Sequence, residues 1–235
     1  MERQVVALVA AHEEAERIAS TVSALHALVD EVVVVDDGSG DATSSAALLA
    51  GATVLRASRR RGKGRAIEEA LLRLPPAAVW LLADADLADS AARLGPLLET
   101  VRDGRADVAI AGFPKLEGGG FGIVKSLAAR AIRAACGFHA AEPLSGQRAL
   151  TSAALTAVRP LAPGFGLEVA MTIDAVRAGL RVLEVPIDGL AHRATGRGVR
   201  GFAHRARQGA DILAAVAGRA VPRTRMRRRP MHGSP

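Results

Sequence analysis

Aromatic residues are scarce in this sequence, which has no tyrosine, one tryptophan and five phenylalanines among 235 residues. Apolar residues nevertheless make up 49% of the chain, enough for a sizeable core in a single domain of this length. That core must therefore consist mainly of valine, leucine, isoleucine and alanine. The scarcity of aromatic side chains also argues against base stacking on single-stranded nucleic acid, and no nucleic-acid partner is expected.

Cysteine is almost absent as well, since Cys136 is the only one. A single thiol excludes an internal disulfide framework and a cluster of metal-bound thiolates. No apolar run approaches the ~20 residues that a membrane-spanning helix needs. The first residues pass directly into strand-like sequence, without the pattern of a secretory signal. A cytoplasmic protein is the simplest expectation.

Acidic residues are missing from the last part of the chain. Of the formal net charge of +7, six charges belong to arginines in residues 219–235, which leaves +1 for residues 1–218. This composition predicts a solvated, disordered basic tail over residues 219–235. The alternative is a weak anchor for anionic lipid, which would place the protein at the inner face of a membrane.

Strand-like and helix-like segments alternate through the first half of the chain. Apolar runs lie at residues 5–9, 32–35, 52–55, 77–83 and 107–111, and helical patterns lie at 15–29, 41–50, 64–73 and 90–103. The run at 32–35 is uninterrupted valine, which is typical of a strand buried on both faces. The alternation predicts an α/β fold with a mostly parallel, Rossmann-like sheet flanked by helices. Ligands bind such sheets at the carboxyl ends of the strands.

The second half of the chain is expected to be mainly helical. The predicted helices lie near residues 122–136, 151–159, 166–178 and 198–217, with one strand at 181–186. No internal repeat or linker divides the chain, so residues 1–218 are predicted to form a single domain.

Two aspartates follow the apolar run at residues 77–83. Asp84 and Asp86 stand one residue apart where the chain leaves the predicted sheet. One carboxylate can bind a divalent metal while the other meets a sugar or ribose hydroxyl, because Mg²⁺ and Mn²⁺ take oxygen ligands and bridge to phosphates. Such an ion would neutralise the charge that grows on a departing nucleoside diphosphate. The alternative is an ordinary acidic turn at a strand end.

Charged residues also follow the neighbouring strands. Asp36 and Asp37 end the valine strand, where an acid can accept hydrogen bonds from a base or a ribose; the alternative is a turn with a helix N-cap. The loop at residues 59–65 combines arginines, two glycines and Lys63. Backbone amides at a helix start together with a lysine suit a diphosphate. The spacing is not that of a P-loop, and a solvated basic loop is the alternative.

Two residues of the second half are further candidates. His192 can complete a metal site that begins at Asp86, although a lone histidine is more often not a ligand. Glu168 stands at the start of a predicted helix. It is either an acid of the helix cap or an acceptor for a sugar hydroxyl.

Taken together, these segments resemble GT-A glycosyltransferases of family 2. The resemblance rests on residues 9–14 (VAAHEE), 36–43 (DDGSGDAT), 62–66 (GKGRA) and 84–86 (DAD), which follow the order and spacing of that family. The second half is more similar to glucosyl-3-phosphoglycerate synthases and their relatives, through residues 143–146 (PLSG), 162–168 (APGFGLE) and 191–193 (AHR). The resemblance spans residues 3–215. It implies a GT-A domain with a nucleotide-binding half at 1–111 and an acceptor-binding half at 112–218.

The resemblance implies a role for each matching position. The residues expected to hold the nucleotide are Ala10 and Ala11 through their backbone, Glu13, Asp37 at the uracil, Lys63 near the phosphates and Asp84 at the ribose or sugar. Asp86 and His192 are expected to bind Mg²⁺ or Mn²⁺, and Glu168 to hold the donor sugar. Leu144, Ser145 and Gly146 are expected to line the pocket between donor and acceptor. The expected catalytic residues are Asp84, Asp86, Glu168 and His192.

The acceptor positions depart from the resembled family. The phosphoglycerate enzymes place an arginine and a threonine soon after the glycine run and an asparagine after Ala-His-Arg, whereas this chain has GFGIVK at residues 120–125 and Ala194. These departures disfavour 3-phosphoglycerate. An anionic acceptor needs cationic partners, for which Lys125, Arg193 and Arg197 are candidates. A polyprenyl-phosphate acceptor stays open, as does a homodimer.

The expected activity is metal-dependent transfer of a hexose from a nucleotide-sugar, with UDP-glucose or a similar donor favoured by the resemblance. The acceptor is a small phosphorylated molecule, a polyprenyl phosphate or another hydroxyl compound. Two alternatives are a sugar-phosphate nucleotidyltransferase on a similar sheet and a protein that binds membranes or nucleic acid through its basic tail. The first would need a glycine-rich loop with arginine after the first strand, where this chain has residues 10–14 (AAHEE).

Overall fold

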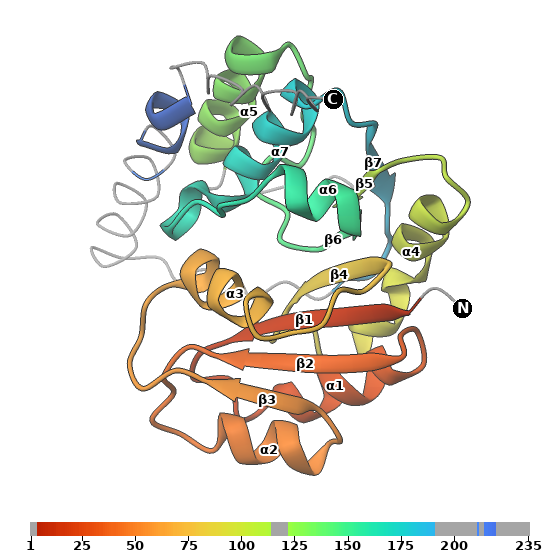
Figure 1. Ribbon diagram of the computed structural model, residues 1–235, viewed down its shortest axis with the longest axis vertical. Helices are drawn as coiled ribbons and strands as arrows, with labels where there is room; N and C mark the ends of the chain where they lie inside the picture. The colour runs from red at the N-terminus through yellow and green to blue at the C-terminus, as the bar shows by residue number, and fades with distance from the viewer. Residues whose placement is uncertain (1–3, 114–121, 191–210, 212–213, 220–235) are drawn as a thin grey trace, which may run out of the picture.

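Seven strands form one mixed sheet in the computed structural model, which describes residues 4–113, 122–190, 211 and 214–219 (Figure 1). The strands are β1 (Val5–Ala11), β2 (Glu31–Asp36), β3 (Thr53–Arg56), β4 (Val79–Asp84), β5 (Val108–Gly112), β6 (Arg148–Thr151) and β7 (Val182–Pro186). Their order in the sheet is β3-β2-β1-β4-β6-β5-β7. Only β6 runs antiparallel to its neighbours, β4 and β5, so the predicted mostly parallel α/β sheet is confirmed.

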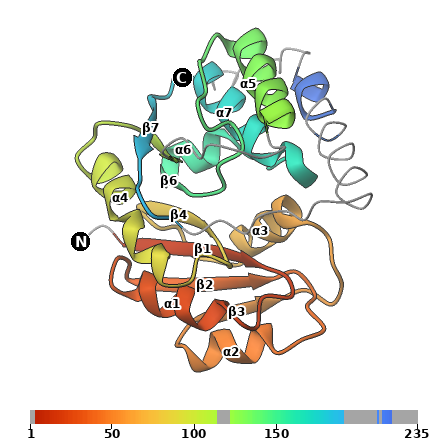
Figure 2. The ribbon, with the colours of Figure 1, turned by 180° about the vertical axis from the view of Figure 1, so that it is seen from behind.

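Helices cover both faces of the sheet. They are α1 (Ile18–His26), α2 (Thr43–Leu49), α3 (Lys63–Leu71), α4 (Gly95–Arg102), α5 (Gly122–Cys136), α6 (Ser152–Ala157) and α7 (Leu167–Arg177), with short 3₁₀ segments η1 (Ala88–Leu94) and η2 (Gly164–Gly166). One face packs against α3, α6 and α7, which lie in front of the sheet in Figure 1. The other packs against α1, α2, η1 and α4, which the reverse view in Figure 2 brings forward.

Strand β1, in the middle of the sheet, is buried on both faces because it is apolar at every position. In β1, Val5, Ala7 and Val9 belong to the cluster under α1 and α4, whereas Val6 and Leu8 belong to the cluster under α3, α6 and α7. This division follows from the alternation of side chains along a strand. The two clusters are built almost entirely of aliphatic residues, as the composition predicted, with Trp80 as the one aromatic side chain in them.

Strand β6 was not predicted from the sequence. It has only four residues, begins with a charged side chain and carries no apolar run, so no periodic pattern marks it. Its place depends on pairing with residues far away in the chain: Arg148 is opposite Leu82 of β4 and Ile110 of β5. The strand inserts antiparallel between β4 and β5 and brings the segment 144–147 to the carboxyl end of β4.

The register of β1 brings the predicted site segments to one edge of the sheet. Ala10 of β1 lies opposite Asp84 of β4, and Ala11 lies opposite Asp36 of β2. The carboxyl ends of three parallel strands therefore meet where the sequence analysis expected a ligand.

Arg219 belongs to the folded body, although the sequence analysis assigned it to the basic tail. Its guanidinium contacts the Asp174 carboxylate of α7 at 2.6 and 2.7 Å, and the two side chains are only 11% and 10% exposed. The other residues of the predicted tail lie outside the described ones, as do His192, Arg193, Arg197 and most of the predicted helix 198–217. Within the described part of the chain, no helix is both long and apolar enough to cross a membrane.

We expect Arg219→Met to lower the free energy of unfolding by about 3–5 kcal/mol, because it leaves the Asp174 carboxylate buried without its counter-charge. Urea unfolding followed by circular dichroism measures the loss. The double variant Asp174→Leu/Arg219→Met is the control, since it removes both charges and is expected to recover most of the lost stability. A single variant that unfolds at the wild-type urea concentration would show that the pair contributes nothing.

Candidate active site at the carboxyl ends of the strands

Lys63, Asp84 and Glu168 form a compact cluster at this edge of the sheet. The Lys63 ammonium, at the first position of α3, donates to Asp84 Oδ1 at 2.7 Å and to Glu168 Oε1 at 3.0 Å. Asp84 ends β4 and Glu168 stands in the first turn of α7. Three residues that the sequence analysis assigned to nucleotide and sugar binding are thus brought together, although 105 positions separate Lys63 from Glu168.

The two carboxylates hold the lysine in its charged form. Burial alone would lower the pKa of Lys63, but the negative charges of Asp84 and Glu168 and their hydrogen bonds outweigh it, so the pKa lies above its ordinary value. Lys63 is therefore a permanent cation at neutral pH. An ammonium group has three N–H donors, and the two carboxylates occupy two of them.

The segment 144–147 packs directly on this cluster. A Cβ atom at Gly146 would lie 2.6 Å from Lys63 Nζ and 2.6 Å from Asp84 Oδ2, so glycine alone fits without moving the ion pair. Gln147 donates from Nε2 to Asp84 Oδ2 at 2.7 Å. Gln147 was not among the predicted site residues, and its position next to Gly146 is the one signal in the sequence that marks it. Leu144 packs toward the apolar cluster of α5, and Ser145 is buried.

The turn that carries Asp84 and Asp86 is held by α1. The hydroxyl of Thr21 donates to the Ala85 carbonyl at 2.8 Å and accepts from the Ala88 backbone N–H at 2.8 Å. Arg17 donates to the Asp86 carbonyl at 3.3 Å. Thr21 is fully buried, so this turn is fixed from beneath while the Asp86 side chain stays partly exposed.

The residues present fit a divalent metal that shares its coordination with a bound nucleotide. The carboxylate of Asp86 is a ligand of the kind that Mg²⁺ and Mn²⁺ prefer, and it would hold such an ion at the turn after β4. No group of three or more His, Cys, Asp or Glu side chains placed to hold an ion occurs among the described residues. His192, the second predicted ligand, lies outside them. An ion at Asp86 therefore needs further oxygen atoms, which a diphosphate can provide.

The predicted nucleotide-binding acids Glu13 and Asp37 shape the loops around them. Both oxygens of Asp37 accept backbone N–H groups, from Arg61 and from Gly62, at 2.7 Å each. Glu13 Oε1 accepts from the Gly40 N–H at 2.6 Å. Asp37 thereby fixes the basic loop at the start of α3, and the backbone of Ala10 and Ala11 lies beside it in β1.

Asp36, the neighbour of Asp37, has a structural role. It is fully buried and accepts from the Ser39 backbone N–H at 2.8 Å, from the Ser39 hydroxyl at 2.6 Å and from the Ser44 hydroxyl. Burial raises the pKa of Asp36, but these hydrogen bonds together with Arg56 outweigh it and hold the pKa below its ordinary value. The turn predicted as the alternative for this motif is therefore built around Asp36.

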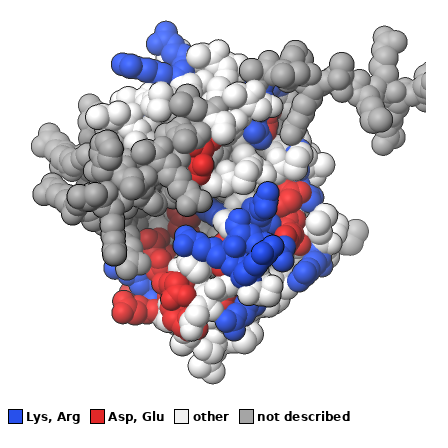
Figure 3. Space-filling view, turned by 90° about the vertical axis from the view of Figure 1, so that its left-hand side faces the viewer, with Lys and Arg blue, Asp and Glu red and all other residues white. Residues whose placement is uncertain are grey.

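Exposed arginines surround the start of α3. Arg59, Arg60 and Arg65 are exposed. Arg61, which precedes α3, pairs with Glu69 of that helix. Figure 3 looks onto this side of the molecule and shows a cluster of basic side chains flanked by acidic ones. The backbone of the loop is held in place, because Asp37 accepts from two of its N–H groups and Gly38, at φ +74°, lies against the backbone of Arg59.

The predicted acceptor residue Lys125, in α5, pairs with an acid of the segment between α5 and β6. Its ammonium donates to Glu142 Oε1 at 2.6 Å. The backbone N–H groups of Ala141 and Glu142 donate in turn to the Glu184 carboxylate of β7, at 2.9 and 2.8 Å. Lys125 is thus engaged by an acid in this structure, and Arg193 is outside the described residues.

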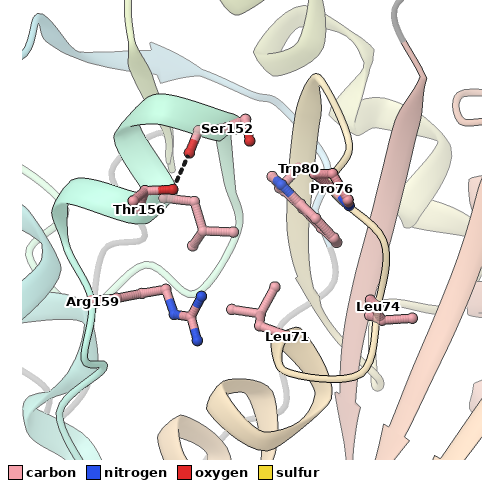
Figure 4. A pocket seen from close by; sticks show the side chains of 8 residues that line it. Leu71, Leu74, Pro76, Trp80, Ser152, Thr156 and Arg159 are labelled. Carbon is pink, nitrogen blue, oxygen red and sulfur yellow. Dashed lines mark hydrogen bonds between the residues drawn. The ribbon is translucent and has the colours of Figure 1, made fainter.

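A small pocket lies at the other end of α3. It has a volume of about 140 Å³ and is lined by Leu71, Leu74, Pro76, Trp80, Ser152, Leu155, Thr156 and Arg159 (Figure 4). Arg159, which points toward it, is paired with Glu68 at 2.8 Å. The pocket contains none of the predicted site residues and is separate from the Lys63 cluster.

The fold and the site define a class: an α/β domain in which an aspartate at the end of β4, a lysine at the start of α3 and Glu168 of α7 form a charged cluster at the carboxyl edge of the sheet. The sequence profile described as Glycosyl transferase family 2 matches residues 6–151, more than half of the chain. The chain therefore belongs to glycosyl transferase family 2 and has the GT-A fold. It is a glycosyltransferase, which decides against the nucleotidyltransferase alternative.

Known relatives agree with this assignment. Glucosyl-3-phosphoglycerate synthase from Mycolicibacterium smegmatis is 33% identical over 220 residues, which cover 81% of this chain and 71% of the relative. Glycosyltransferase AglJ from Haloferax volcanii is 30% identical over 183 residues, which cover 74% of this chain and 59% of AglJ. The solved glucosyl-3-phosphoglycerate synthase of Mycobacterium tuberculosis, in complex with Mn²⁺, UDP and glucosyl-3-phosphoglycerate, superposes with a TM-score of 0.77 at 28% identity, over 95% of this chain and 82% of that one.

Proposed function

We propose that the protein transfers a hexose from a UDP-sugar to a hydroxyl group of a phosphorylated acceptor, with Mg²⁺ or Mn²⁺ bound at Asp86 and His192. The observation that carries the proposal is the Lys63–Asp84–Glu168 cluster at the carboxyl edge of the sheet. Support comes from the similar synthase, which was solved with Mn²⁺ and UDP-glucose. The bound ion would supply positive charge against the departing diphosphate.

The residues of the cluster have different roles, some in binding the donor and one in stabilising charge. The third N–H of Lys63 has no acceptor among the described residues; it would donate to a phosphate oxygen of the donor and put a positive charge beside the leaving group. Asp84 and Glu168 are positioned to accept hydrogen bonds from ribose or sugar hydroxyls. The loops that Glu13 and Asp37 hold would bind the base and the ribose of the donor. Lys63 would face the phosphates.

The acceptor is proposed to carry a phosphate group. The similar synthase was solved with phosphoglyceric acid and with glycerol 3-phosphate. The changes at residues 120–125 and at Ala194 indicate that this chain recognises its acceptor with other residues, such as Lys125 and Arg193. A small phosphorylated molecule and a polyprenyl phosphate both meet this description. Membrane contact through the basic tail and homodimer formation stay predictions.

A thermal-shift screen of nucleotide-sugars tests the donor. We expect UDP-glucose or another UDP-sugar with Mn²⁺ to raise the melting temperature by about 5–10 °C at 100 times its Kd, because a ligand that binds only the folded state stabilises it by mass action. Chelation of Mn²⁺ should abolish the shift. A larger shift with a GDP-sugar would refute the UDP assignment, and no shift with any nucleotide-sugar would refute the proposed function.

A further inference from the structure

Strand β6 carries a fully buried arginine beneath the site. Arg148 is 1% exposed and lies in register between Leu82 of β4 and Ile110 of β5. Burial lowers the pKa of Arg148 to about 10, although the negative charges of Glu168 and Glu184 favour its charged form. The side chain is therefore still a cation at neutral pH, in an interior that consists mainly of aliphatic residues.

Two hydrogen bonds connect this guanidinium to two different parts of the site. Nε donates to the Ser145 carbonyl at 2.9 Å, and Nη1 donates to the Thr172 hydroxyl at 3.0 Å. The Thr172 hydroxyl donates to the Glu168 carbonyl at 3.0 Å, one helical turn earlier in α7. Nη2 is buried and finds no hydrogen-bond partner among the described residues.

These contacts close a ring around the site. Ser145 precedes Gly146, which lies against the Lys63–Asp84 pair, and Lys63 contacts Glu168 from the other side. Arg148 and Thr172 complete the ring from below. One buried side chain, Arg148, thus links the segment 144–147 to the first turns of α7.

Stability alone does not explain why an arginine occupies this position. A buried guanidinium with one unpartnered nitrogen bears a desolvation cost that its hydrogen bonds offset only in part. Apolar side chains of similar volume often stabilise a fold as well as buried charges do. The side chain therefore contributes something other than folding free energy.

We propose that Arg148 is a positioning residue for glycosyl transfer, which holds the segment 144–147 and Glu168 in the relative geometry that the reaction requires. The proposal rests on the proposed function, because Glu168 is the residue proposed to hold the donor sugar. Arg148 acts through Ser145 and Thr172 and does not itself touch a ligand.

The test compares three variants of the full-length protein: Arg148→Met, Thr172→Val and, as a matched control, Thr100→Val. Thr100 is as buried as Thr172, but its hydroxyl bonds to the Pro96 carbonyl of α4 on the opposite face of the sheet. We expect Arg148→Met to lower kcat about 100-fold, since a misplacement of about 1 Å costs that much. Thr172→Val should lower kcat about tenfold. The control Thr100→Val should have the wild-type kcat.

Two further measurements separate positioning from a merely structural role. The affinity for UDP with Mn²⁺, measured by calorimetry, should stay within about twofold in Arg148→Met, because UDP lacks the sugar that Glu168 would hold. The double variant Arg148→Met/Thr172→Val should lose no more kcat than Arg148→Met alone, since both residues belong to one network.

The proposal is overturned if folded Arg148→Met keeps a kcat within about twofold of the wild type. If Arg148→Met does not fold, Thr172→Val decides, and a wild-type kcat in that variant overturns the proposal. A wild-type protein that binds no UDP would instead refute the proposed function, so the two failures are distinguishable.

Discussion

Replacement of Lys63 by methionine is expected to lower kcat/KM for glycosyl transfer about 100- to 1000-fold, which is the usual effect of removing one preorganised donor that faces developing charge. The substitution keeps most of the unbranched side chain and removes the ammonium that lies 2.7 Å from Asp84 and 3.0 Å from Glu168. It also leaves these two carboxylates close together without the cation between them. Steady-state kinetics of UDP release measures the effect.

The control for Lys63 is Arg73→Met, which removes an exposed positive charge just beyond the other end of α3. This variant should retain the wild-type kcat/KM, because Arg73 lies outside the cluster. A Lys63→Met protein that is folded and keeps its activity within about tenfold would contradict the role given to the cluster.

Asp86→Ala is expected to weaken UDP binding in the presence of Mn²⁺ by about 100-fold or more, because the metal would lose its carboxylate ligand. UDP affinity in the presence of a chelator should not change, since that binding does not use the ion. Calorimetric titrations of UDP with Mn²⁺ and with EDTA measure both quantities.

Asp89→Ala is the matched control for Asp86. Asp89 is an exposed acid in η1, three positions further along the chain, and its removal should leave metal-dependent binding at the wild-type level. Equal titrations of the wild type and Asp86→Ala would show that the metal lies elsewhere.

Local sequence determined the elements of the first half because each is encoded within a few neighbouring residues. The uninterrupted valines at residues 32–35 predicted a strand buried on both faces, and β2 has that burial. The helical pattern at residues 15–29 predicted α1, whose buried side includes Ile18, Val22 and Leu25. The Asp-x-Asp pair after β4 marked the edge of the sheet at which the charged site is found.

The arrangement of the second half depended on contacts between distant residues. Strand β6 is too short for a periodic pattern, and its insertion between β4 and β5 depends on pairing with those strands and on packing of Ala149 and Leu150 in the core. The partners of Lys63 could not be read from the sequence either, because Asp84 and Glu168 are 21 and 105 positions away. Gln147 and Arg148 became functional candidates only through the contacts that β6 makes.

Hydropathy and short motifs thus determined the α/β class, the edge of the sheet that carries the site and the chemical groups available there, because these properties belong to single strands and turns. The tertiary structure decided which of those groups meet. Packing of α3, α7 and β6 against the sheet places Lys63 between two carboxylates and buries Arg148 beneath them, and such packing energies are sums over residues that the sequence keeps far apart.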